Sequence, residues 1–201
     1  MNKIEKEPSH TYTSVAESVF QVERSAWNNC ANFIDDNRNI GNPFLSHEFF
    51  SCLEESGSVS KETGWISQHI LLFEEGNSLI GILPNYLKNH SWGEYIFDQV
   101  FANAWENAGG KYYPKLLSAI PFSPVAGERF LIKKGYSRKF VIEKLLDALE
   151  DLKKFYKVSS AHINFINEPQ LKIALKNKFW FERNNIQFHW RNQNYENFEH
   201  F

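Results

Sequence analysis

The sequence lacks the features that mark several large classes of protein. It has two cysteines, Cys30 and Cys52, which lie far apart and match no zinc-binding spacing, so we expect no metal site. No apolar run approaches 18 residues, so no membrane-spanning helix is expected. The N-terminus is polar and alternates in charge, unlike a signal peptide. These absences predict a soluble, reduced, cytoplasmic protein.

The chain also lacks an excess of charge of either sign. Its 22 Lys and Arg residues against 24 Asp and Glu residues give a formal net charge of -2. A general nucleic-acid binder normally carries a basic excess, so we do not expect that activity. A nucleotide P-loop and a dinucleotide glycine fingerprint are both missing. What the 201 residues do have is 42% hydrophobic and 16% aromatic side chains, which favours a sizeable core and argues against global disorder.

The pattern along the chain predicts one main domain. We expect a flexible N-terminus over residues 1–10, a single domain over residues 11–190 and a C-terminal segment over residues 191–201. Strands are expected over residues 10–16, 68–74, 78–88, 112–121, 125–132 and 159–166, with a last strand or hairpin over 179–190. Helices are expected over residues 22–34, 43–57, 94–108, 138–156 and 168–176. Helices alternating with strands around an antiparallel hairpin predict an α/β fold, a mixed central sheet with helices on both faces.

Acid–base chemistry concentrates in two stretches, residues 86–98 and 112–115. Only there do His, carboxylate, Tyr and Lys occur together between apolar strands. Such mixtures are costly to bury alone, so we expect them to line a wet cavity or to face each other. A loop that carries His, Glu, Tyr and Asp can position an amine and remove its proton. The alternative is a solvated loop whose Trp92 and Tyr95 cover the sheet.

Other residues can be interpreted either as functional or as structural. His47, which follows Ser46 at a helix start, can act as a base or pack at the helix end. Tyr112, Tyr113 and Lys115 can bind a substrate carboxylate or phosphate through their hydroxyl and ammonium groups. In the other interpretation they belong to an ordinary edge strand.

Three sequence blocks resemble the FemAB-like family of peptidoglycan biosynthesis and recognition, within the wider acyl-CoA N-acyltransferase (GNAT) superfamily. The first is residues 42–49, Asn-Pro-Phe-Leu-Ser-His-Glu-Phe. The second is residues 84–98, Pro-Asn-Tyr-Leu-Lys-Asn-His-Ser-Trp-Gly-Glu-Tyr-Ile-Phe-Asp, which continues through Tyr-Tyr-Pro-Lys-Leu at 112–116 and Pro-Phe-Ser-Pro-Val-Ala-Gly at 121–127. The third is residues 187–192, Gln-Phe-His-Trp-Arg-Asn.

The resemblance implies a GNAT-like fold with a site for an acyl donor. In GNAT enzymes, the loop between the fourth strand and the long helix holds the pyrophosphate of acyl-CoA. Here that loop contains Lys133, Lys134, Gly135 and Arg138, and the helix N-terminus would offer free N–H groups to a phosphate. The closely spaced glycines of the usual loop are absent. The resemblance also implies that this chain is the first of two GNAT-type halves, with residues 191–201 leading towards the second.

The resemblance implies an N-acyltransferase that moves an acyl or aminoacyl group to an amine, for which a cell-wall precursor is one candidate. The donor would be acyl-CoA or aminoacyl-tRNA, and no cofactor would be covalently bound. In this reading Glu94 or Asp98 is the general base, with His90 as a competitor, and Tyr86 or Tyr95 protonates the leaving group or orients the amine.

The same resemblance leaves the substrate-binding and partner roles open. Tyr86, Lys88, His47, Tyr112, Tyr113 and Lys115 are the residues assigned to substrate binding. The alternative function is a non-catalytic recognition module or half-domain that binds a cell-wall or amine ligand. The expected protein partner is a second copy of the chain or a second half.

Overall fold

The structure is a computed structural model, and it describes residues 5–33 and 41–200. Its strands form two four-stranded sheets. The first has the order β1 (Thr11–Ala16), β3 (His69–Glu74), β4 (Ser78–Leu83), β7 (Leu131–Ile132). The second has the order β2 (Trp65–Ser67), β5 (Tyr86–Lys88), β6 (Lys115–Ser118), β8 (Ala161–Ile163). Only the β6–β8 pair is parallel among these ladders, so the first sheet is antiparallel and the second is mixed. The α/β class is as predicted, but the strands form two sheets where one central mixed sheet was expected.

One long hairpin joins the two sheets. Its arms run through β2 and β3 and back through β4 and β5, and both arms break at the same level. There the Gln68 N–H donates to the Asn85 carbonyl at 2.7 Å, and the Asn85 side chain donates back to the Gln68 carbonyl at 3.2 Å. Pro84 has no N–H to give to a ladder, which is why the expected strand over residues 78–88 divides here. The hairpin therefore belongs to both sheets.

Helices cover both faces of the first sheet, which confirms the predicted layering. The helices are α1 (Arg24–Cys30), α2 (His47–Glu55), α3 (Gln99–Asn107), α4 (Arg138–Tyr156) and α5 (Glu168–Ala174). The short 3-10 turns are η1 (Val19–Gln21), η2 (Pro43–Leu45) and η3 (Phe198–His200). Because side chains alternate along a strand, Leu71 and Ile82 pack on the side of α1 and α2, whereas Ile70 and Leu72 pack on the side of α4.

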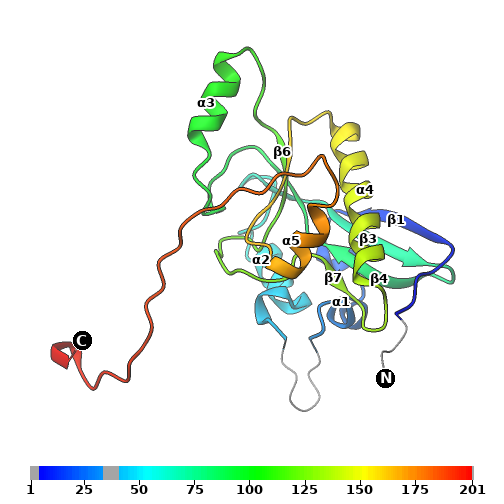
Figure 1. Ribbon diagram of the computed structural model, residues 1–201, viewed down its shortest axis with the longest axis horizontal. Helices are drawn as coiled ribbons and strands as arrows, with labels where there is room; N and C mark the ends of the chain where they lie inside the picture. The colour runs from blue at the N-terminus through cyan, green and yellow to red at the C-terminus, as the bar shows by residue number, and fades with distance from the viewer. Residues whose placement is uncertain (1–4, 34–40, 201) are drawn as a thin grey trace.

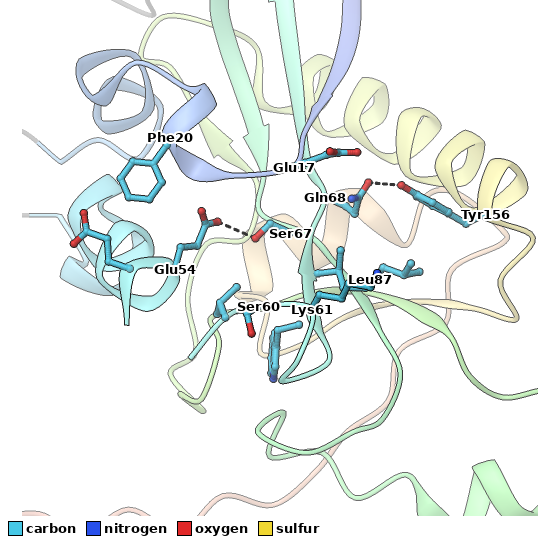
Figure 2. Close-up of a pocket in the computed structure, with 13 residues that line it drawn as sticks. Glu17, Phe20, Glu54, Ser60, Lys61, Ser67, Gln68, Leu87 and Tyr156 are labelled. Atoms are coloured by element: carbon cyan, nitrogen blue, oxygen red, sulfur yellow. Dashed lines mark hydrogen bonds between the residues drawn. The ribbon is translucent and has the colours of Figure 1, made fainter. Parts of the chain in front are cut away.

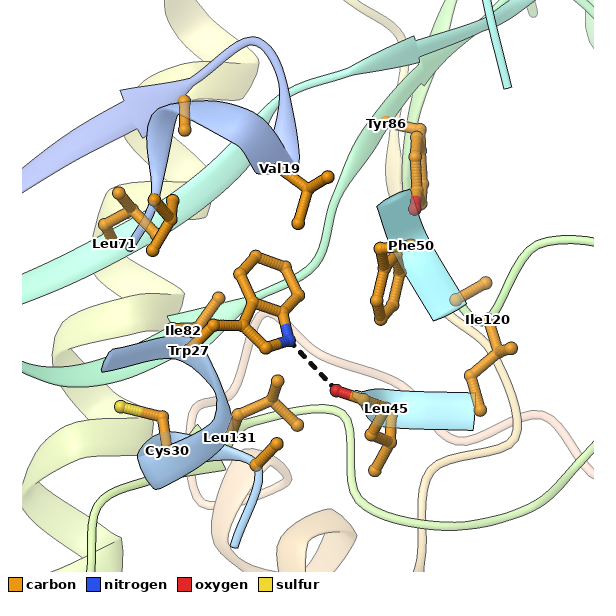
Figure 3. Packing of buried hydrophobic residues seen from close by; sticks show 14 of the residues in the cluster. Val19, Trp27, Cys30, Leu45, Phe50, Leu71, Ile82, Tyr86, Ile120 and Leu131 are labelled. Atoms are coloured by element: carbon orange, nitrogen blue, oxygen red, sulfur yellow. Dashed lines mark hydrogen bonds between the residues drawn. The ribbon is translucent and has the colours of Figure 1, made fainter. Parts of the chain in front are cut away.

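Trp27 lies at the centre of the first of these cores (Figure 3). Its ring is fully buried beside Phe50, at 5.1 Å between ring centres, and its indole N–H donates to the Leu45 carbonyl at 2.9 Å. That bond ties α1 to the turn that precedes α2. Burying the large aromatic ring stabilises the fold only because its polar N–H is satisfied.

The long helix α4 has the bounds expected from the sequence. The Ser137 hydroxyl accepts a hydrogen bond from the Phe140 N–H and so caps the first turn. Apolar residues at helical spacing face the sheet, and Val141 and Leu145 are fully buried. The helix lies so close to β4 that a Cβ at Gly81 would be 2.5 Å from the Val141 Cγ1 atom. The small residue in the strand thus permits this packing.

Several expected elements are shorter in the structure or absent from it. The helix over residues 22–34 is only α1, because Asn32 takes a left-handed conformation, and residue 34 lies outside the described residues. The helix over 94–108 begins at Gln99, after left-handed backbone at Gly93 and Tyr95. The strand over 125–132 is reduced to β7, because the Arg129 and Phe130 N–H groups bond to a side chain.

The expected strand or hairpin over residues 179–190 was wrong. Residues 180–195 have no helix or strand, and much of the segment is exposed. In Figure 1 the C-terminal segment, coloured orange to red, runs away from the body, and α3 also stands apart from the sheets. Among the described residues, no helix is long and apolar enough to cross a membrane.

Candidate functional site

A buried lysine is the centre of the candidate site. Lys115, on β6, is 1% exposed and its ammonium group makes three hydrogen bonds. It donates to Glu94 Oε2 at 2.8 Å, to Asp98 Oδ2 at 2.6 Å and to the Ser91 hydroxyl at 2.8 Å. The three acceptors all lie in the loop that links β5 to α3. The strand therefore fixes the cation, and the loop folds around it.

The two carboxylates are not fully satisfied by protein groups. Glu94 and Asp98 are both buried, and in each only one oxygen has a hydrogen-bond donor. Glu94 Oε1 and Asp98 Oδ1 have no hydrogen-bond partner among the described residues. A buried acceptor of this kind carries a free-energy cost, so it is a natural place for an N–H or O–H group of a ligand.

The environment moves the pKa values of the two carboxyl groups in opposite directions. Burial raises the pKa of Glu94, and this outweighs the attraction of Lys115. Burial acts in the same sense on Asp98, but hydrogen bonds from Lys115, Ser91 and Tyr112 outweigh it and lower the pKa of Asp98. Paired acidic groups whose pKa values are pushed apart are the usual arrangement for an acid–base residue beside a charged one.

A second buried lysine lies next to this group. The Lys88 ammonium nitrogen is 3.7 Å from the centre of the Trp65 ring and donates to the Trp92 carbonyl at 3.3 Å. Burial, with the nearby Lys115 charge, lowers the pKa of Lys88 to about 7 despite the opposing effect of Glu94. The pKa of Lys88 therefore lies close to neutral pH.

Tyrosine hydroxyls complete what we call the lysine–carboxylate cluster, which consists of Lys88, Ser91, Glu94, Asp98, Tyr112, Tyr113 and Lys115. The Tyr112 hydroxyl donates to Asp98 Oδ2 at 2.8 Å, and the Tyr113 and Ser91 hydroxyls are 2.7 Å apart. Burial and the Asp98 charge raise the pKa of Tyr112. The structure thus brings together six residues that the sequence had singled out.

One member of the cluster, Ser91, and one neighbour of it, His162, had no clear signal in the sequence. Ser91 was quoted only as part of a motif, yet it bonds both Lys115 and Tyr113. His162, on β8, lies with its ring centre 6.3 Å from that of Tyr112, and burial, followed by the Lys115 charge, lowers its pKa to about 4. An imidazole that stays neutral beside the cluster could have been found only by pairing β8 with β6.

Other residues expected in the site lie outside the cluster. The His47 ring lies within 3.2 Å of the Val19 and Val22 carbonyls, in the core of the first sheet. The His90 ring accepts from the Trp92 N–H and contacts the Thr63 carbonyl at 3.0 Å, so it fixes a turn.

Two of the expected tyrosines also lie apart. Tyr95 is 53% exposed, whereas the Tyr86 ring is buried, with its centre 5.1 Å from that of Trp65.

The expected donor loop lies in another part of the molecule. Lys133, Lys134, Gly135 and Arg138 line a pocket of about 360 Å³ together with Glu5, Glu128 and other residues. The charges are partly compensated, because Arg138 donates to Glu128 at 2.7 Å. The loop backbone is also engaged: the Lys6 N–H donates to the Gly135 carbonyl at 2.8 Å, and the Ser137 N–H donates to the Lys6 carbonyl at 3.0 Å.

Figure 2 shows a larger cavity, of about 670 Å³, whose lining contains no residue of the cluster. Its wall includes Trp65 and Leu87. The Trp65 ring also makes the cation–π contact with the Lys88 ammonium group, so this one side chain links the cavity to the cluster. Three carboxylate residues also line it: Glu17, Glu54 and Glu55. The lining has one basic residue, Lys61, among the described residues, so acidic side chains outnumber basic ones around the cavity.

Glu54 is held in its ionised form at the edge of this cavity. It accepts hydrogen bonds from the Ser18 hydroxyl at 2.6 Å, the Ser67 hydroxyl at 2.8 Å and the Val19 N–H at 3.1 Å. Burial alone would raise its pKa, but these bonds and the neighbouring His69 lower it to about 2. The carboxylate ties η1, α2 and β2 together.

We expect Glu54→Gln to lower the free energy of unfolding by about 1.5–3 kcal/mol at pH 7, since it removes charge-assisted hydrogen bonds. The folded-state pKa of Glu54 lies below the ordinary value of 4.5, so its stabilisation is present above that value and is lost as the pH falls towards 2. Urea unfolding at several pH values should therefore show a shallower acid limb in Glu54→Gln. The exposed Glu55→Gln is the control, and equal losses in the two variants would contradict this account.

A family model described as peptidoglycan biosynthesis/recognition, FemAB-like, matches residues 18–201. The chain belongs to the FemAB-like family. The match includes all residues of the lysine–carboxylate cluster and of the larger cavity except Glu17. No curated protein sequence gives a significant match to this FemAB-like chain.

Three solved structures similar to this FemAB-like chain are acetyltransferases. AAC(6')-Iy, solved with the bisubstrate analogue CoA-S-monomethyl-acetylneamine, has a TM-score of 0.50 at 10% identity and covers 92% of this chain and 99% of its own. The aminoglycoside 6'-N-acetyltransferase AAC(6')-Ih from Acinetobacter baumannii has a TM-score of 0.46 at 10% identity, with 91% and 99% covered. A Trypanosoma brucei acetyltransferase has a TM-score of 0.44 at 11% identity, with 91% and 100% covered. At such identities, the likeness to AAC(6')-Iy shows a shared GNAT fold.

Proposed function

We propose that this chain transfers an acyl or aminoacyl group from a thioester or ester to an amine of a cell-wall precursor. The family and the GNAT fold support the reaction class. The observation that carries the proposal is the pair of buried carboxylate oxygens, Glu94 Oε1 and Asp98 Oδ1, that have no hydrogen-bond partner among the described residues. An amine acceptor supplies the N–H groups that such oxygens lack.

The chemistry assigns different roles to the two carboxylates. The amine nitrogen attacks the acyl carbonyl carbon, a C–N bond forms and the C–S or C–O bond breaks. The amine loses one proton to the base, and the donor leaves as a thiol or alcohol once its sulfur or oxygen has taken up one proton. Glu94, whose pKa is raised by burial, is the proposed base, since a base is most effective when its pKa approaches the working pH. Asp98, whose pKa is lowered, stays ionised and keeps Lys115 in place.

The lysines are the proposed electrostatic partners of the reacting carbonyl. Negative charge develops on its oxygen as the amine adds, and fixed N–H donors in a dry site stabilise that charge. Among the described residues the Lys88 ammonium donates to one acceptor, the Trp92 carbonyl, whereas the Lys115 ammonium makes three hydrogen bonds. Lys88 is therefore the better candidate for this role.

Access to the cluster requires a change in the loop over residues 89–98. Trp92 and Phe97 of this loop are 75% and 81% exposed, while Ser91 and Glu94 face inwards. Gly93, at φ +78°, takes next to Glu94 a left-handed conformation that glycine adopts without strain. We propose that the loop opens to admit the amine and that the acidic cavity beyond Trp65 holds the cationic remainder of the acceptor.

Ligand binding measured by thermal unfolding tests the proposal. The probes are acetyl-CoA, a hydrolysis-resistant aminoacyl-tRNA end analogue, and a stem peptide with a free side-chain amine. A ligand at 100 times its Kd raises the free energy of unfolding by about 2.7 kcal/mol. The transferase predicts stabilisation by the peptide and by one of the two donors. Stabilisation by none of the three would contradict it.

One observation favours the second candidate, a recognition module without catalysis. The backbone of Gly135 and Ser137, in the expected donor loop, already pairs with Lys6. If that pairing persists, the loop has fewer polar groups to offer a pyrophosphate. The recognition module predicts that the stem peptide stabilises the protein and that neither acyl donor does.

A further inference from the structure

A buried guanidinium group just before β7 has no negatively charged partner. Arg129 is 1% exposed, and no ion pair among the described residues includes it. It donates instead to three neutral oxygens, the carbonyls of Asn164 at 2.8 Å, Glu128 at 2.9 Å and Val125 at 2.5 Å. Burial lowers the pKa of Arg129 to about 10, so the group is still charged at pH 7. A buried charge of this kind carries a free-energy cost that an anion would offset.

Arg129 and a neighbouring amide both have N–H groups to spare. A guanidinium group carries five N–H groups. The three hydrogen bonds of Arg129 use one on each nitrogen, so one N–H remains on Nη1 and one on Nη2. The neighbour is Asn42, whose Oδ1 accepts from the Phe44 N–H at 3.1 Å and so caps η2. This bond fixes which end of the amide is the donor, and Asn42 Nδ2 has no acceptor among the described residues.

The two donors border one open space, beside Gly127. A Cβ at Gly127 would lie 3.4 Å from Asn42 Nδ2 and 3.8 Å from Arg129 Nη1. Among the described residues, its chain neighbours aside, it would meet no other heavy atom within 4 Å. Both distances are ordinary van der Waals contacts, so the space holds one heavy atom without strain. A space bordered by N–H donors, one of them cationic, suits an oxygen of an anion.

The segment that leads to Gly127 also contacts the loop of the candidate site. Residues 119–126 form no strand between β6 and β7, and the chain rejoins the sheet at Gly127, whose N–H donates to the Phe165 carbonyl at 3.0 Å. Within this segment the Phe122 N–H donates to the Gly93 carbonyl at 3.1 Å, in the loop that contains Glu94. The open space and the proposed base are therefore linked through one short stretch of chain.

We propose that Arg129 Nη1 and Asn42 Nδ2 bind a carboxylate group of the acceptor in the open space beside Gly127. A carboxylate offers its oxygens in one plane, and its hydrogen bonds to guanidinium are among the stronger ones in proteins. A phosphate brings a further oxygen, for which no third donor borders this space among the described residues. The carboxylate site rests on this geometry, whereas the assignment of the carboxylate to the acceptor rests on the proposed function.

Thermal unfolding at pH 7, in sodium acetate against sodium chloride of equal ionic strength, tests the site independently of any activity. Acetate should raise the melting temperature of the wild-type protein, because it binds the folded state. Gly127→Ala places a methyl group in the open space at ordinary contact distances, so this variant should fold and lose the acetate effect.

Asn42→Asp tests the same site from the other side. It keeps the oxygen that accepts from Phe44, and it exchanges the donor Nδ2 for an anionic oxygen near Arg129. We expect the melting temperature in chloride to rise by about 2 °C or more, because the buried guanidinium gains a counter-charge, and the acetate effect to disappear. Asn103→Asp, at an exposed position on α3, is the matched control and should change neither quantity.

A stem peptide with a side-chain amine tests whether the carboxylate belongs to the acceptor. The peptide is prepared with its carboxylates free and with all of them converted to amides, and binding is measured by calorimetry. The wild-type protein should bind the free acid about 10–100-fold more tightly, the range expected for charge-assisted hydrogen bonds. Gly127→Ala should bind both forms equally.

The contrary results are distinct for the site and for the reaction. The site is overturned by a wild-type protein that acetate does not stabilise, by stabilisation with phosphate but not acetate, or by an acetate effect that survives in both Gly127→Ala and Asn42→Asp. Equal binding of the two peptide forms, or of neither, overturns the assignment to the acceptor. If the peptide binds only as the free acid and is never acylated, the inference stands and the transferase proposal fails. If both forms are acylated equally well, the transferase stands and the inference fails.

Discussion

Lys115→Met is expected to lower the free energy of unfolding by about 3–5 kcal/mol, because it leaves buried carboxylates without their counter-charge. Glu94 and Asp98 each bond the Lys115 ammonium group, and all three side chains are at most 2% exposed. Urea unfolding at pH 7 measures the change. The exposed Lys111→Met is the control and should cost little.

The loss of stability in Lys115→Met should depend on pH. Without Lys115 the pKa values of the carboxyl groups rise above their unfolded-state values, so the loss is complete at high pH and shrinks as the pH falls towards 4. Adding Asp98→Asn to Lys115→Met should recover part of the stability, since the carboxylate that ionises most readily is then neutral. A loss in Lys115→Met that is the same at pH 4 and pH 7 would contradict the charge-pair account.

Glu94→Gln is expected to lower kcat by about 10²–10⁴-fold, the usual contribution of a positioned general base. The KM for the amine should change little, because the amide still accepts a hydrogen bond. The acid limb of the wild-type rate profile should lie above the ordinary carboxyl range, since burial raises the pKa of Glu94, and the limb should disappear in the variant.

Asp98→Asn and Glu106→Gln separate catalysis from structure. Asp98 accepts hydrogen bonds from Lys115 and Tyr112, so Asp98→Asn should lower the free energy of unfolding. It should also reduce kcat, because Lys115 is then held less firmly, but by less than Glu94→Gln does. Glu106 is an exposed carboxylate on α3, and its loss should leave both quantities unchanged. If Glu94→Gln lowers stability yet keeps full activity per folded molecule, Glu94 is structural.

Local sequence signals were sufficient for much of the fold. The bounds of α4 follow from the Ser137 cap and a regular apolar stripe, and both depend on residues close in sequence. The break near Pro84 follows from its missing N–H. The strand over 125–132 failed for a long-range reason: the Gln170 side chain, from α5, bonds the N–H groups of Arg129 and Phe130 in place of a neighbouring strand.

The candidate site could be predicted in its residue types but not in its arrangement. Lys115 stood out in the sequence beside two tyrosines, yet only the pairing of β5 with β6 sets it opposite the loop that contains Glu94. Tyr95 has the same chemistry as Tyr112, but its left-handed backbone turns with the loop and leaves the ring exposed. The contact of Lys6 with the expected donor loop has no local signal at all, because 129 positions separate Lys6 from Gly135.

Mass spectrometry of an amine-bearing stem peptide tests the central claim most directly. The full chain is incubated with the peptide and with either acetyl-CoA or an aminoacyl-tRNA, in parallel with Glu94→Gln and Glu106→Gln. We predict that the peptide gains one acyl or aminoacyl group on its amine with the wild-type protein and with Glu106→Gln, and that Glu94→Gln gives almost none. A peptide that binds but gains no group from either donor would contradict the transferase account.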